Sequence, residues 1–192
     1  MMIKIRFCGF GGQGIVLLAE ILGHAAVFAG KWAAQSASYG AEARGSASTS
    51  EVIISEEWIP YPKVEEADIL VAMSQDGYNK YLKEVVEGGT ILFDSTLVRP
   101  DGDGDGDGKG NAPKRHHRYP IPASRLAREE LESPIVANMI MLGALIRLTG
   151  VVSPEETRGA IEAHVAERFR ELDLRALEVG LRLAEELKER DE

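Results

Sequence analysis

The sequence predicts an α/β fold, a Rossmann-like three-layer domain with a mostly parallel sheet and additional C-terminal helices. Three observations support this prediction. Strand-like apolar runs alternate with helical patterns through the first half of the chain, which is typical of βαβ units. A glycine cluster directly follows the first run and precedes a helical pattern. Beyond residue 122 the patterns are helical only. With 192 residues, we expect a single domain over 1–192.

The first half contains the strands of the predicted sheet. Pro60 and Pro62 make the segment around them an extended connection, because proline lacks the N–H that a helix or central strand uses. The runs bounded by turn residues are the buried strands of a parallel sheet. We expect strands over 3–10, 32–39, 49–55, 67–73 and 90–95, and helices over 15–28 and 75–86, the second ended by Gly88 and Gly89.

The C-terminal third is predicted to be helical. Residues 135–148 are apolar nearly all round, which indicates a central buried helix. Ser153 followed by Pro154 is typical of a helix start, with serine as the N-cap and proline at the first helical position. Residues 172–187 predict a final amphipathic helix with a charged outer face.

Asp and Gly alternate over residues 101–108. Such a segment has no apolar side chains whose burial would offset the entropy cost of ordering it, so we expect a flexible surface loop over 101–112. A calcium loop that begins at Asp101 would need an acid at its twelfth position, where Ala112 stands. The basic residues 114–118 are expected to form a solvated edge strand.

Composition places the chain among ordinary globular proteins, with 44% hydrophobic and 28% charged residues. The net charge of −9 argues against nucleic-acid binding, which needs a basic surface. The apolar stretch 135–146 is too short to span a bilayer, and the N-terminus lacks the features of a secretory signal. We therefore expect a cytoplasmic protein that binds neither nucleic acid nor membrane.

Cys8 is the one cysteine of the sequence. A single cysteine excludes an internal disulfide, and it excludes an iron–sulfur cluster held by this chain alone, because such clusters usually need four thiolates. Its apolar neighbours predict a buried thiol. The histidines lack His-Glu-x-x-His spacing, and no serine lies in a Gly-x-Ser-x-Gly turn. The sequence therefore predicts no metal site and no catalytic residue.

The strongest motif is a glycine loop, Gly-Phe-Gly-Gly-Gln-Gly at 9–14, between a predicted strand and a predicted helix. Glycines there allow a tight turn and the close approach of a phosphate or another backbone, while the helix N-terminus adds free N–H groups. Three interpretations stay open: a dinucleotide site, a loop that faces a phosphate or a partner subunit, and a turn that only packs the helix on the strand. The candidate binding residues are Gly9, Gly11, Gly12, Gln13 and Gly14.

A second candidate segment follows the second strand. A dinucleotide site would place an Asp or Glu at the end of that strand, but residues 36–39 are Ser-Ala-Ser-Tyr. Glu42 comes later, in a glycine-bounded loop with Arg44, which should lie beside the glycine loop at the carboxyl ends of the strands. Arg44 could hold a phosphate or carboxylate, or form a local ion pair with Glu42. Tyr39, Glu42 and Arg44 are therefore further candidates.

These segments together resemble a known family. The glycine loop, Ser-Tyr-Gly-Ala-Glu-Ala-Arg-Gly at 38–45 and Val-Ala-Asn-Met at 136–139 resemble the gamma subunits of 2-oxoacid:ferredoxin oxidoreductases, which include the pyruvate/ketoisovalerate oxidoreductase gamma chains. The resemblance extends over about 3–185. The Tyr-Gly-x-Glu-x-Arg form is most similar to the 2-oxoglutarate type. Two features depart from the family: Ser46 replaces a usual glycine, and the Asp-Gly insertion is not typical.

The resemblance implies a reaction in which a 2-oxoacid and coenzyme A (CoA) give acyl-CoA and carbon dioxide, with electrons passed to ferredoxin. It implies alpha-type, beta-type and delta-type partner subunits. Thiamine diphosphate would lie between the alpha-type and beta-type subunits, and iron–sulfur clusters in the beta-type and delta-type subunits. This chain would hold no cofactor alone. Its glycine loop and Arg44 would face the CoA phosphates or the rim of the partner's active site.

Two other functions stay open. A stand-alone dinucleotide-binding oxidoreductase would bind NAD or FAD and would need a catalytic acid or base near the glycine loop. A purely structural scaffold subunit would use the loop only for packing. As a gamma subunit, the isolated chain would be inactive, and it could form a homodimer.

Overall fold

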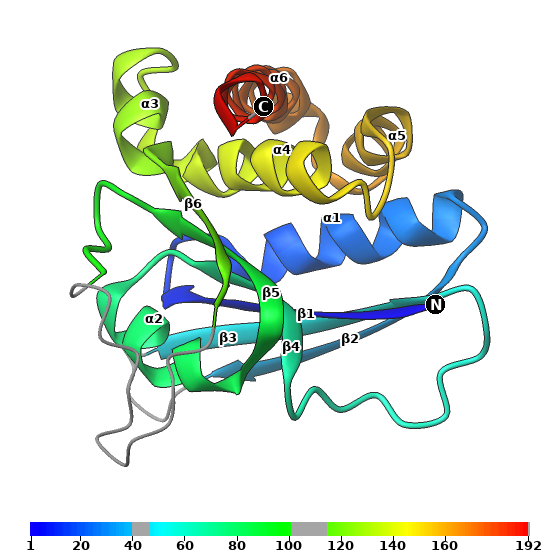
Figure 1. Ribbon diagram of the computed structural model, residues 1–192. Coiled ribbons are helices and arrows are strands. Elements are labelled where there is room, and N and C mark those ends of the chain that lie inside the picture. The colour runs from blue at the N-terminus through cyan, green and yellow to red at the C-terminus, as the bar shows by residue number, and fades with distance from the viewer. Residues whose placement is uncertain (40–46, 101–114, 192) are drawn as a thin grey trace.

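The computed structural model describes residues 1–39, 47–100 and 115–191 (Figure 1). The strands are β1 (Met2–Phe10), β2 (Trp32–Tyr39), β3 (Ala47–Ser55), β4 (Ala67–Ala72), β5 (Val85–Asp94) and β6 (His117–Ile121). The α-helices are α1 (Ile15–Phe28), α2 (Gln75–Tyr81), α3 (Ala123–Glu129), α4 (Ala137–Thr149), α5 (Pro154–His164) and α6 (Glu167–Asp191). Two short 3-10 turns are η1 (Leu82–Glu84) and η2 (Pro134–Val136).

The strands form one mixed sheet in the order β2-β3-β1-β4-β5-β6. The pairs β1–β4, β4–β5 and β5–β6 are parallel, whereas β3 runs antiparallel to both of its neighbours, β1 and β2. The α/β class is therefore confirmed, with an antiparallel hairpin where the strand and helix alternation suggested parallel strands. Only residues 40–46 connect β2 to β3, which is too few for the crossover that parallel neighbours need.

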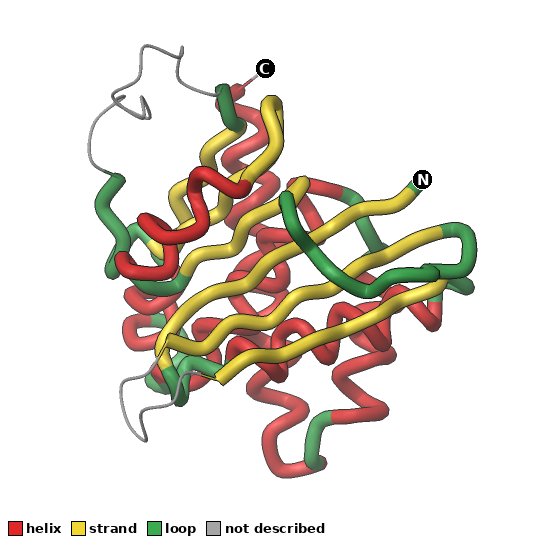
Figure 2. Tube along the Cα trace, turned by 90° about the horizontal axis from the view of Figure 1, so that it is seen from below, coloured by secondary structure: helices red, strands yellow, loops and turns green. Residues whose placement is uncertain are grey.

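Helices cover both faces of the sheet, so the predicted three layers are confirmed (Figure 1). On one face α1 packs on β2 and β3 and α4 contacts β5, while α5 packs on α1 and α6 on α4. Figure 2 shows the opposite face, where α2 lies against the strands. The main core lies between the sheet and the helices α1 and α4, with Phe7, Leu18, Leu92 and Ile140 fully buried. The C-terminal helices therefore pack against the core and belong to the same domain.

The predicted buried helix is α4, where every residue from Ala137 through Ile146 is buried. Its contact with α6 is close enough to bring the two backbones together at Gly143 and Gly180. A Cβ atom on Gly180 would lie 2.0 Å from the carbonyl oxygen of Ile140, so no larger residue fits there without moving a helix.

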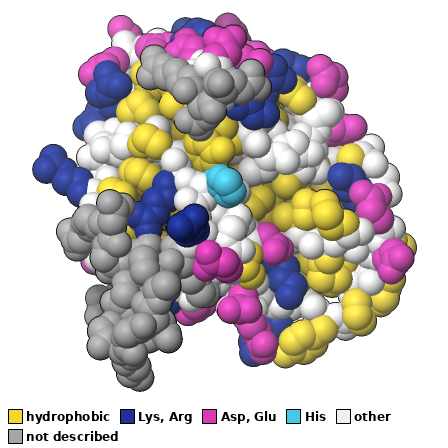
Figure 3. Space-filling model, viewed as in Figure 1, with side chains coloured by type: hydrophobic (Ala, Val, Ile, Leu, Met, Phe, Trp, Pro, Cys, Tyr) yellow, Lys and Arg dark blue, Asp and Glu magenta, His cyan; other side chains and the backbone are white. Residues whose placement is uncertain are grey.

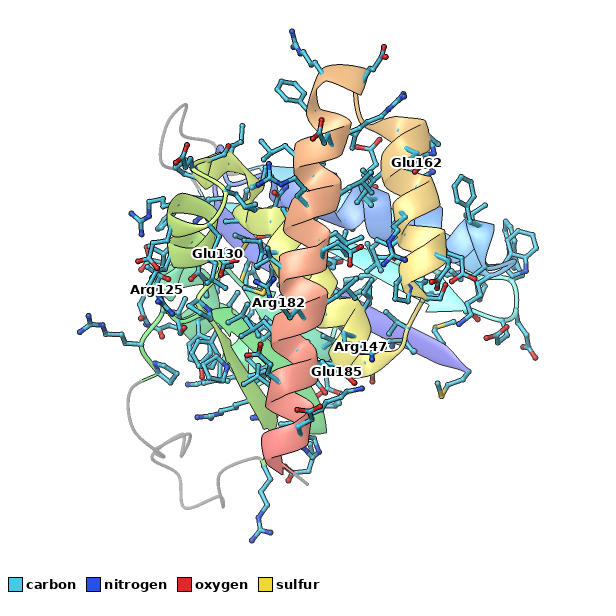
Figure 4. All side chains as sticks on the ribbon, turned by 90° about the horizontal axis from the view of Figure 1, so that it is seen from above. Arg125, Glu130, Arg147, Glu162, Arg182 and Glu185 are labelled. Carbon is cyan, nitrogen blue, oxygen red and sulfur yellow. The ribbon has the colours of Figure 1, made fainter. Side chains whose placement is uncertain are left out.

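Two ion pairs connect the outer face of α6 to residues of neighbouring elements (Figure 4). Arg182 Nη2 lies 2.8 Å from Glu130 Oε2, just beyond α3, and Arg147 of α4 pairs with Glu185. All four side chains are exposed, so each pair contributes little to stability, about 0–1 kcal/mol. The position of α6 therefore rests mainly on its packing against α4.

The predicted start of α5 is confirmed. Ser153 Oγ accepts a hydrogen bond from the Glu156 N–H at 3.3 Å, and Glu156 Oε2 accepts one from the Ser153 N–H at 2.7 Å. Pro154 is the first residue of the helix. These reciprocal bonds form a capping box, which fixes the start of the helix from residues three positions apart. They also lower the pKa of the Glu156 carboxyl.

The helix expected over 75–86 is wrong in its second half. α2 ends at Tyr81, and the chain enters β5 at Val85, so Gly88 and Gly89 lie inside a strand instead of ending a helix. Gly88 has φ +74°, and the pairing of β4 with β5 shifts register at this point. A glycine-supported irregularity of this kind lets the strand begin earlier than its apolar run suggests.

The flexible surface loop that the sequence predicts over 101–112 lies outside the described residues. Among the described helices, none is both long and apolar enough to cross a membrane.

On the face shown in Figure 3, hydrophobic side chains are exposed in separate patches among charged ones. Large exposed hydrophobic side chains of the described structure include Trp58, Tyr61 and Ile135.

Candidate functional site

The glycine loop joins the carboxyl end of β1 to α1 and is closed by its own hydrogen bonds. The Gln13 N–H donates to the Phe10 carbonyl at 3.2 Å, and Gln13 Oε1 accepts from the Phe10 N–H at 2.6 Å. Gln13 Nε2 donates to the carbonyl of Met73, at the end of the neighbouring strand β4, at 2.9 Å. Gln13 therefore holds the loop to the sheet, and its amide is already engaged within the chain.

The glycines of the loop differ in their surroundings. A Cβ on Gly9 would lie 2.5 Å from Gln13 Oε1, and one on Gly14 would lie 2.3 Å from Asn138 Nδ2, so both positions need glycine for packing. Gly12 has φ +92° and nothing within 4 Å of a Cβ, and it is exposed with Gly11. The packing interpretation thus holds for Gly9 and Gly14, whereas the Gly11-Gly12 turn is open to a ligand.

The N-terminus of α1 has no side-chain cap. Its N-cap is Gly14, with φ +71°, and its first turn contains no acidic residue. The first hydrogen bond of the helix is the one from the Leu18 N–H to the Gly14 carbonyl, at 2.9 Å. The N–H groups of Ile15, Val16 and Leu17 come before this bond. They carry a partial positive charge and need acceptors from outside the helix. This arrangement is favourable for binding an acceptor or an anion.

A pocket of about 410 Å³ opens beside this loop. α1 contributes Ile15, Val16 and Leu17, and β3 contributes Ser48. Its volume is in the range of small-molecule sites, and its walls are mainly apolar, as such sites usually are. The other described lining residues come from the glycine loop, from η2 and the start of α4, and from the start of α6: Phe10, Gly11, Gly12, Gly14, Ile135, Val136, Asn138, Phe169, Leu172 and Asp173.

Asn138 connects the loop to α4. Its Nδ2 donates to the Gly14 carbonyl at 3.2 Å, while its Oδ1 accepts from the Met139 N–H at 2.9 Å. The residue is 3% exposed. This explains why a polar residue interrupts the apolar run of the buried helix: it satisfies a backbone carbonyl at the N-cap of α1.

Among the described lining residues, Asp173 in the first turns of α6 is the one with a charged side chain. It is buried, and burial raises its pKa to about 6. Asp173 is not among the candidate residues that the sequence motifs indicate. A signal was present, because Asp173 is four residues after Phe169 and four before Leu177, on the apolar side of an amphipathic helix. An acid at such a position is unusual and indicates a binding or structural task.

The second candidate segment is described only at its ends. Tyr39 is the last residue of β2 and pairs with Ser48 of β3, which in turn pairs with Gly9 of the glycine loop. The two ends therefore meet at the edge of the sheet where the glycine loop lies, as expected from the sequence. Glu42 and Arg44 lie outside the described residues.

Cys8 is buried, as predicted, and burial raises the pKa of its thiol to about 12. It therefore offers no thiolate to a metal at neutral pH. Among the described residues, no group of three or more His, Cys, Asp or Glu side chains is placed to hold a metal ion.

Known proteins share this chain's sequence over nearly its whole length. A model of the family described as pyruvate ferredoxin/flavodoxin oxidoreductase matches residues 4–183. The 2-oxoglutarate synthase subunit KorC of Methanocaldococcus jannaschii is 47% identical over 185 residues, covering 96% of this chain and 95% of that protein. KorC of Methanothermobacter marburgensis is 42% identical over 181 residues, covering 94% of this chain and 95% of that protein.

Two solved structures are similar to this chain over nearly its whole length. The gamma subunit of a keto/oxoacid ferredoxin oxidoreductase from Geobacter sulfurreducens has a TM-score of 0.78 and 39% identity, covering 95% of this chain and 98% of that one. A 2-oxoglutarate:ferredoxin oxidoreductase from Magnetococcus marinus has a TM-score of 0.79 and 26% identity, covering 96% of this chain and 31% of that longer one. The resemblance found in the sequence is confirmed. The chain belongs to the pyruvate ferredoxin/flavodoxin oxidoreductase family, as a gamma-type subunit of a 2-oxoacid:ferredoxin oxidoreductase.

Proposed function

We propose that the chain is the gamma subunit of a 2-oxoglutarate:ferredoxin oxidoreductase. The complex converts 2-oxoglutarate and CoA into succinyl-CoA and carbon dioxide and passes the electrons to ferredoxin. The similarity to 2-oxoglutarate synthase subunits of two archaea supports this choice of 2-oxoacid. The Tyr-Gly-x-Glu-x-Arg form at 39–44 supports it independently.

In this proposal the chain forms the CoA side of the active site. The observation that carries it is the uncapped N-terminus of α1 beside the open Gly11-Gly12 turn, at the edge of a pocket. The N–H groups there, together with Arg44, are suited to the negative charges of CoA. The Magnetococcus marinus enzyme has 2-oxoglutarate, coenzyme A and succinyl-CoA bound.

The remaining chemistry belongs to partner subunits. Thiamine diphosphate between the alpha-type and beta-type subunits would supply the carbanion chemistry of decarboxylation, and iron–sulfur clusters in the beta-type and delta-type subunits would carry electrons. The residues of this chain do not fit a cluster, because its one cysteine is Cys8, which is buried. We expect a cytoplasmic complex, and an isolated chain that is inactive as a monomer or a homodimer.

The first test is co-purification of the tagged full-length chain from its native cytoplasm. We expect larger partners with iron–sulfur absorbance, and CoA-dependent reduction of a viologen dye with 2-oxoglutarate that exceeds the reduction with pyruvate or ketoisovalerate. A preference for another 2-oxoacid would contradict the substrate. Recovery of the chain alone, without iron–sulfur absorbance but with NAD or FAD binding, would favour the stand-alone oxidoreductase.

The second test concerns the site. In the purified complex, Arg44→Ala and Gly12→Ala should each raise the KM for CoA, Arg44→Ala by about tenfold because it removes a charged hydrogen-bond donor. Gly30→Ala is the matched control, since Gly30 has φ +74° and open surroundings like Gly12 but lies at the other end of α1. An unchanged KM in both site variants would leave only the scaffold function.

A further inference from the structure

The two outer edges of the sheet differ in how they are protected from pairing with another chain. β6 is short, and it carries Arg118 and Pro120, which are residue types that oppose edge-to-edge pairing. β2 has eight residues, and among the described strands it pairs with β3 alone. Its sequence, Trp-Ala-Ala-Gln-Ser-Ala-Ser-Tyr, contains no charged residue and no proline. The edge of β2 is therefore suited to pairing with a further strand.

The second half of β2 is accessible from outside. Residues 35–38 are all exposed, although successive residues of a strand point to opposite faces of the sheet. Both faces of the strand are therefore accessible at this end. The backbone N–H and C=O groups that point away from β3 need water or another strand as their hydrogen-bond partner.

An exposed aromatic pair lies at the other end of β2. Trp32, the first residue of the strand, is 48% exposed, and Trp58 is 67% exposed. Their ring centroids are 5.0 Å apart in an edge-to-face arrangement. Tryptophan side chains contribute strongly to binding when another molecule covers them. The β2 edge thus combines unpaired backbone groups with exposed apolar surface.

The absence of charge indicates which partner fits this edge. The chain has a net charge of −9, so two copies repel each other over most of their surface. β2 is the one described strand without a charged residue, so two β2 edges can meet without placing like charges opposite each other. A partner recognised by complementary charge would need ionic groups on this edge, whereas an identical copy needs none.

The sequence of β2 also fits its own copy in an antiparallel register. A two-fold axis at Gln35 places Ala33 opposite Ala37 of the second copy. The same axis places Trp32 opposite Ser38 of the second copy. Small side chains then face small ones, and each indole has space beside a serine. Such a contact uses the same surface on both chains, as in the two-fold dimers that are the commonest oligomers.

We propose that β2 is a homodimerisation edge, which pairs antiparallel with β2 of a second copy so that one sheet continues through both chains. The proposal depends neither on the choice of 2-oxoacid nor on the CoA site. One strand with an aromatic pair is a smaller contact than a permanent interface, so the dimer of the isolated chain is weak and reversible. In the assembled complex, the same contact joins two gamma subunits.

The first test is cysteine cross-linking of the purified full-length chain. In the proposed register, Gln35 lies directly opposite its own copy, within reach of a disulfide. Ser38 is the matched control on the same exposed edge, because its two copies lie roughly 20 Å apart along the strands. Under mild oxidation, Gln35→Cys should give a covalent dimer and Ser38→Cys almost none. The native Cys8 is buried and does not compete.

The second test measures the affinity of the dimer by sedimentation over a range of concentrations. Gln35→Lys places two like charges directly opposite each other and removes them from water, so it should raise the dissociation constant by about tenfold. His117→Lys adds the same charge to β6, at the opposite edge of the sheet, and should leave the constant unchanged.

Three results would overturn the proposal. The first is a full-length chain that sediments as a monomer at every concentration, and the second is equal cross-linking of Gln35→Cys and Ser38→Cys. The third comes from the purified complex, where Gln35→Cys should again link two gamma chains. A product that joins this chain to a different subunit would assign the edge to that partner instead. The dye-reduction assay with 2-oxoglutarate is a separate readout, so failure here leaves the proposed function intact.

Discussion

At the scale of single residues, the glycine loop contains positions with opposite tolerances. Gly14 combines φ +71° with a Cβ position 2.3 Å from Asn138 Nδ2, and Asn138 is itself buried. Gly14→Ala should therefore lower the free energy of unfolding by roughly 2–3 kcal/mol, from backbone strain and displacement of Asn138. Gly30→Ala has the strain without the collision and should cost only about 1 kcal/mol. Urea denaturation measures both, and equal losses would contradict the role of Asn138.

Asp173 gives stability a pH dependence of definite sign. Burial raises its pKa from 3.8 to about 6, so the folded chain binds the proton more tightly than the unfolded chain does. The contribution of Asp173 to stability therefore falls as pH rises from about 4 to about 6, and stays low above that. Asp173→Asn should raise the free energy of unfolding at pH 7 by roughly 2 kcal/mol and change it little below pH 4. Thermal melts of both proteins at pH 4, 5, 6 and 7 test this, and a difference that does not grow with pH would refute it.

At the scale of elements, α6 depends on the glycine contact with α4. A Cβ on Gly180 would lie 2.0 Å from the Ile140 carbonyl oxygen, and one on Gly143 would lie 2.2 Å from that of Leu177. Both neighbours are backbone atoms in helices, so they cannot move aside singly. Because α6 also carries Asp173 and Phe169, a change in its position would alter the pocket as well as the core.

We therefore expect Gly180→Ala to lower the free energy of unfolding by about 3 kcal/mol or more, since the helices must separate. Gly23→Ala is the control, because Gly23 is in the interior of α1 with nothing within 4 Å of a Cβ. That variant should gain about 0.5–1 kcal/mol from helix propensity. Chemical denaturation followed by circular dichroism distinguishes them. A mild loss in Gly180→Ala would mean that the crossing tolerates a wider spacing.

At the scale of the whole molecule, the Asp-Gly segment is proposed to be separable from the domain. The described residues on both sides are attached to the body: the Arg99 N–H donates to Gln75 Oε1 at 2.8 Å, and the Arg115 N–H donates to Glu87 Oε1 at 3.0 Å. Shortening the connection between two fixed ends changes the loop-closure entropy only slightly.

Deletion of residues 103–108 should therefore leave the melting temperature within about 2 °C of the wild-type value. The KM for CoA of the purified complex should also stay unchanged, since none of the described residues that flank the segment lines the pocket. Replacement of the same residues by Gly-Ser repeats controls for the lost charge. A drop of several degrees, or a complex that no longer assembles, would show that the segment is part of the domain.

Local features of the sequence determined much of the fold. Periodicity marked α1 and the buried α4, and the Ser153 capping box marked α5, because these elements are decided by residues a few positions apart. The motif order also identified the family, which the comparisons confirm. Within the candidate site, the sequence indicated the glycine loop, and Gly11, Gly12 and Gly14 do line the pocket.

Contacts between distant residues were decided only by the tertiary structure. Gln13 holds the loop through Met73, 60 positions away, and Asn138 reaches Gly14 across 124 positions. The start of β5 at Val85 follows from pairing with β4, which overrides a local helical pattern. Asp173 joins the pocket because α6, which packs on α4, shares the lining of the pocket with the start of α1. The sequence by itself therefore determined the elements and the family, whereas packing between elements determined which side chains share the pocket, since burial and hydrogen-bond partners depend on contacts that no local pattern encodes.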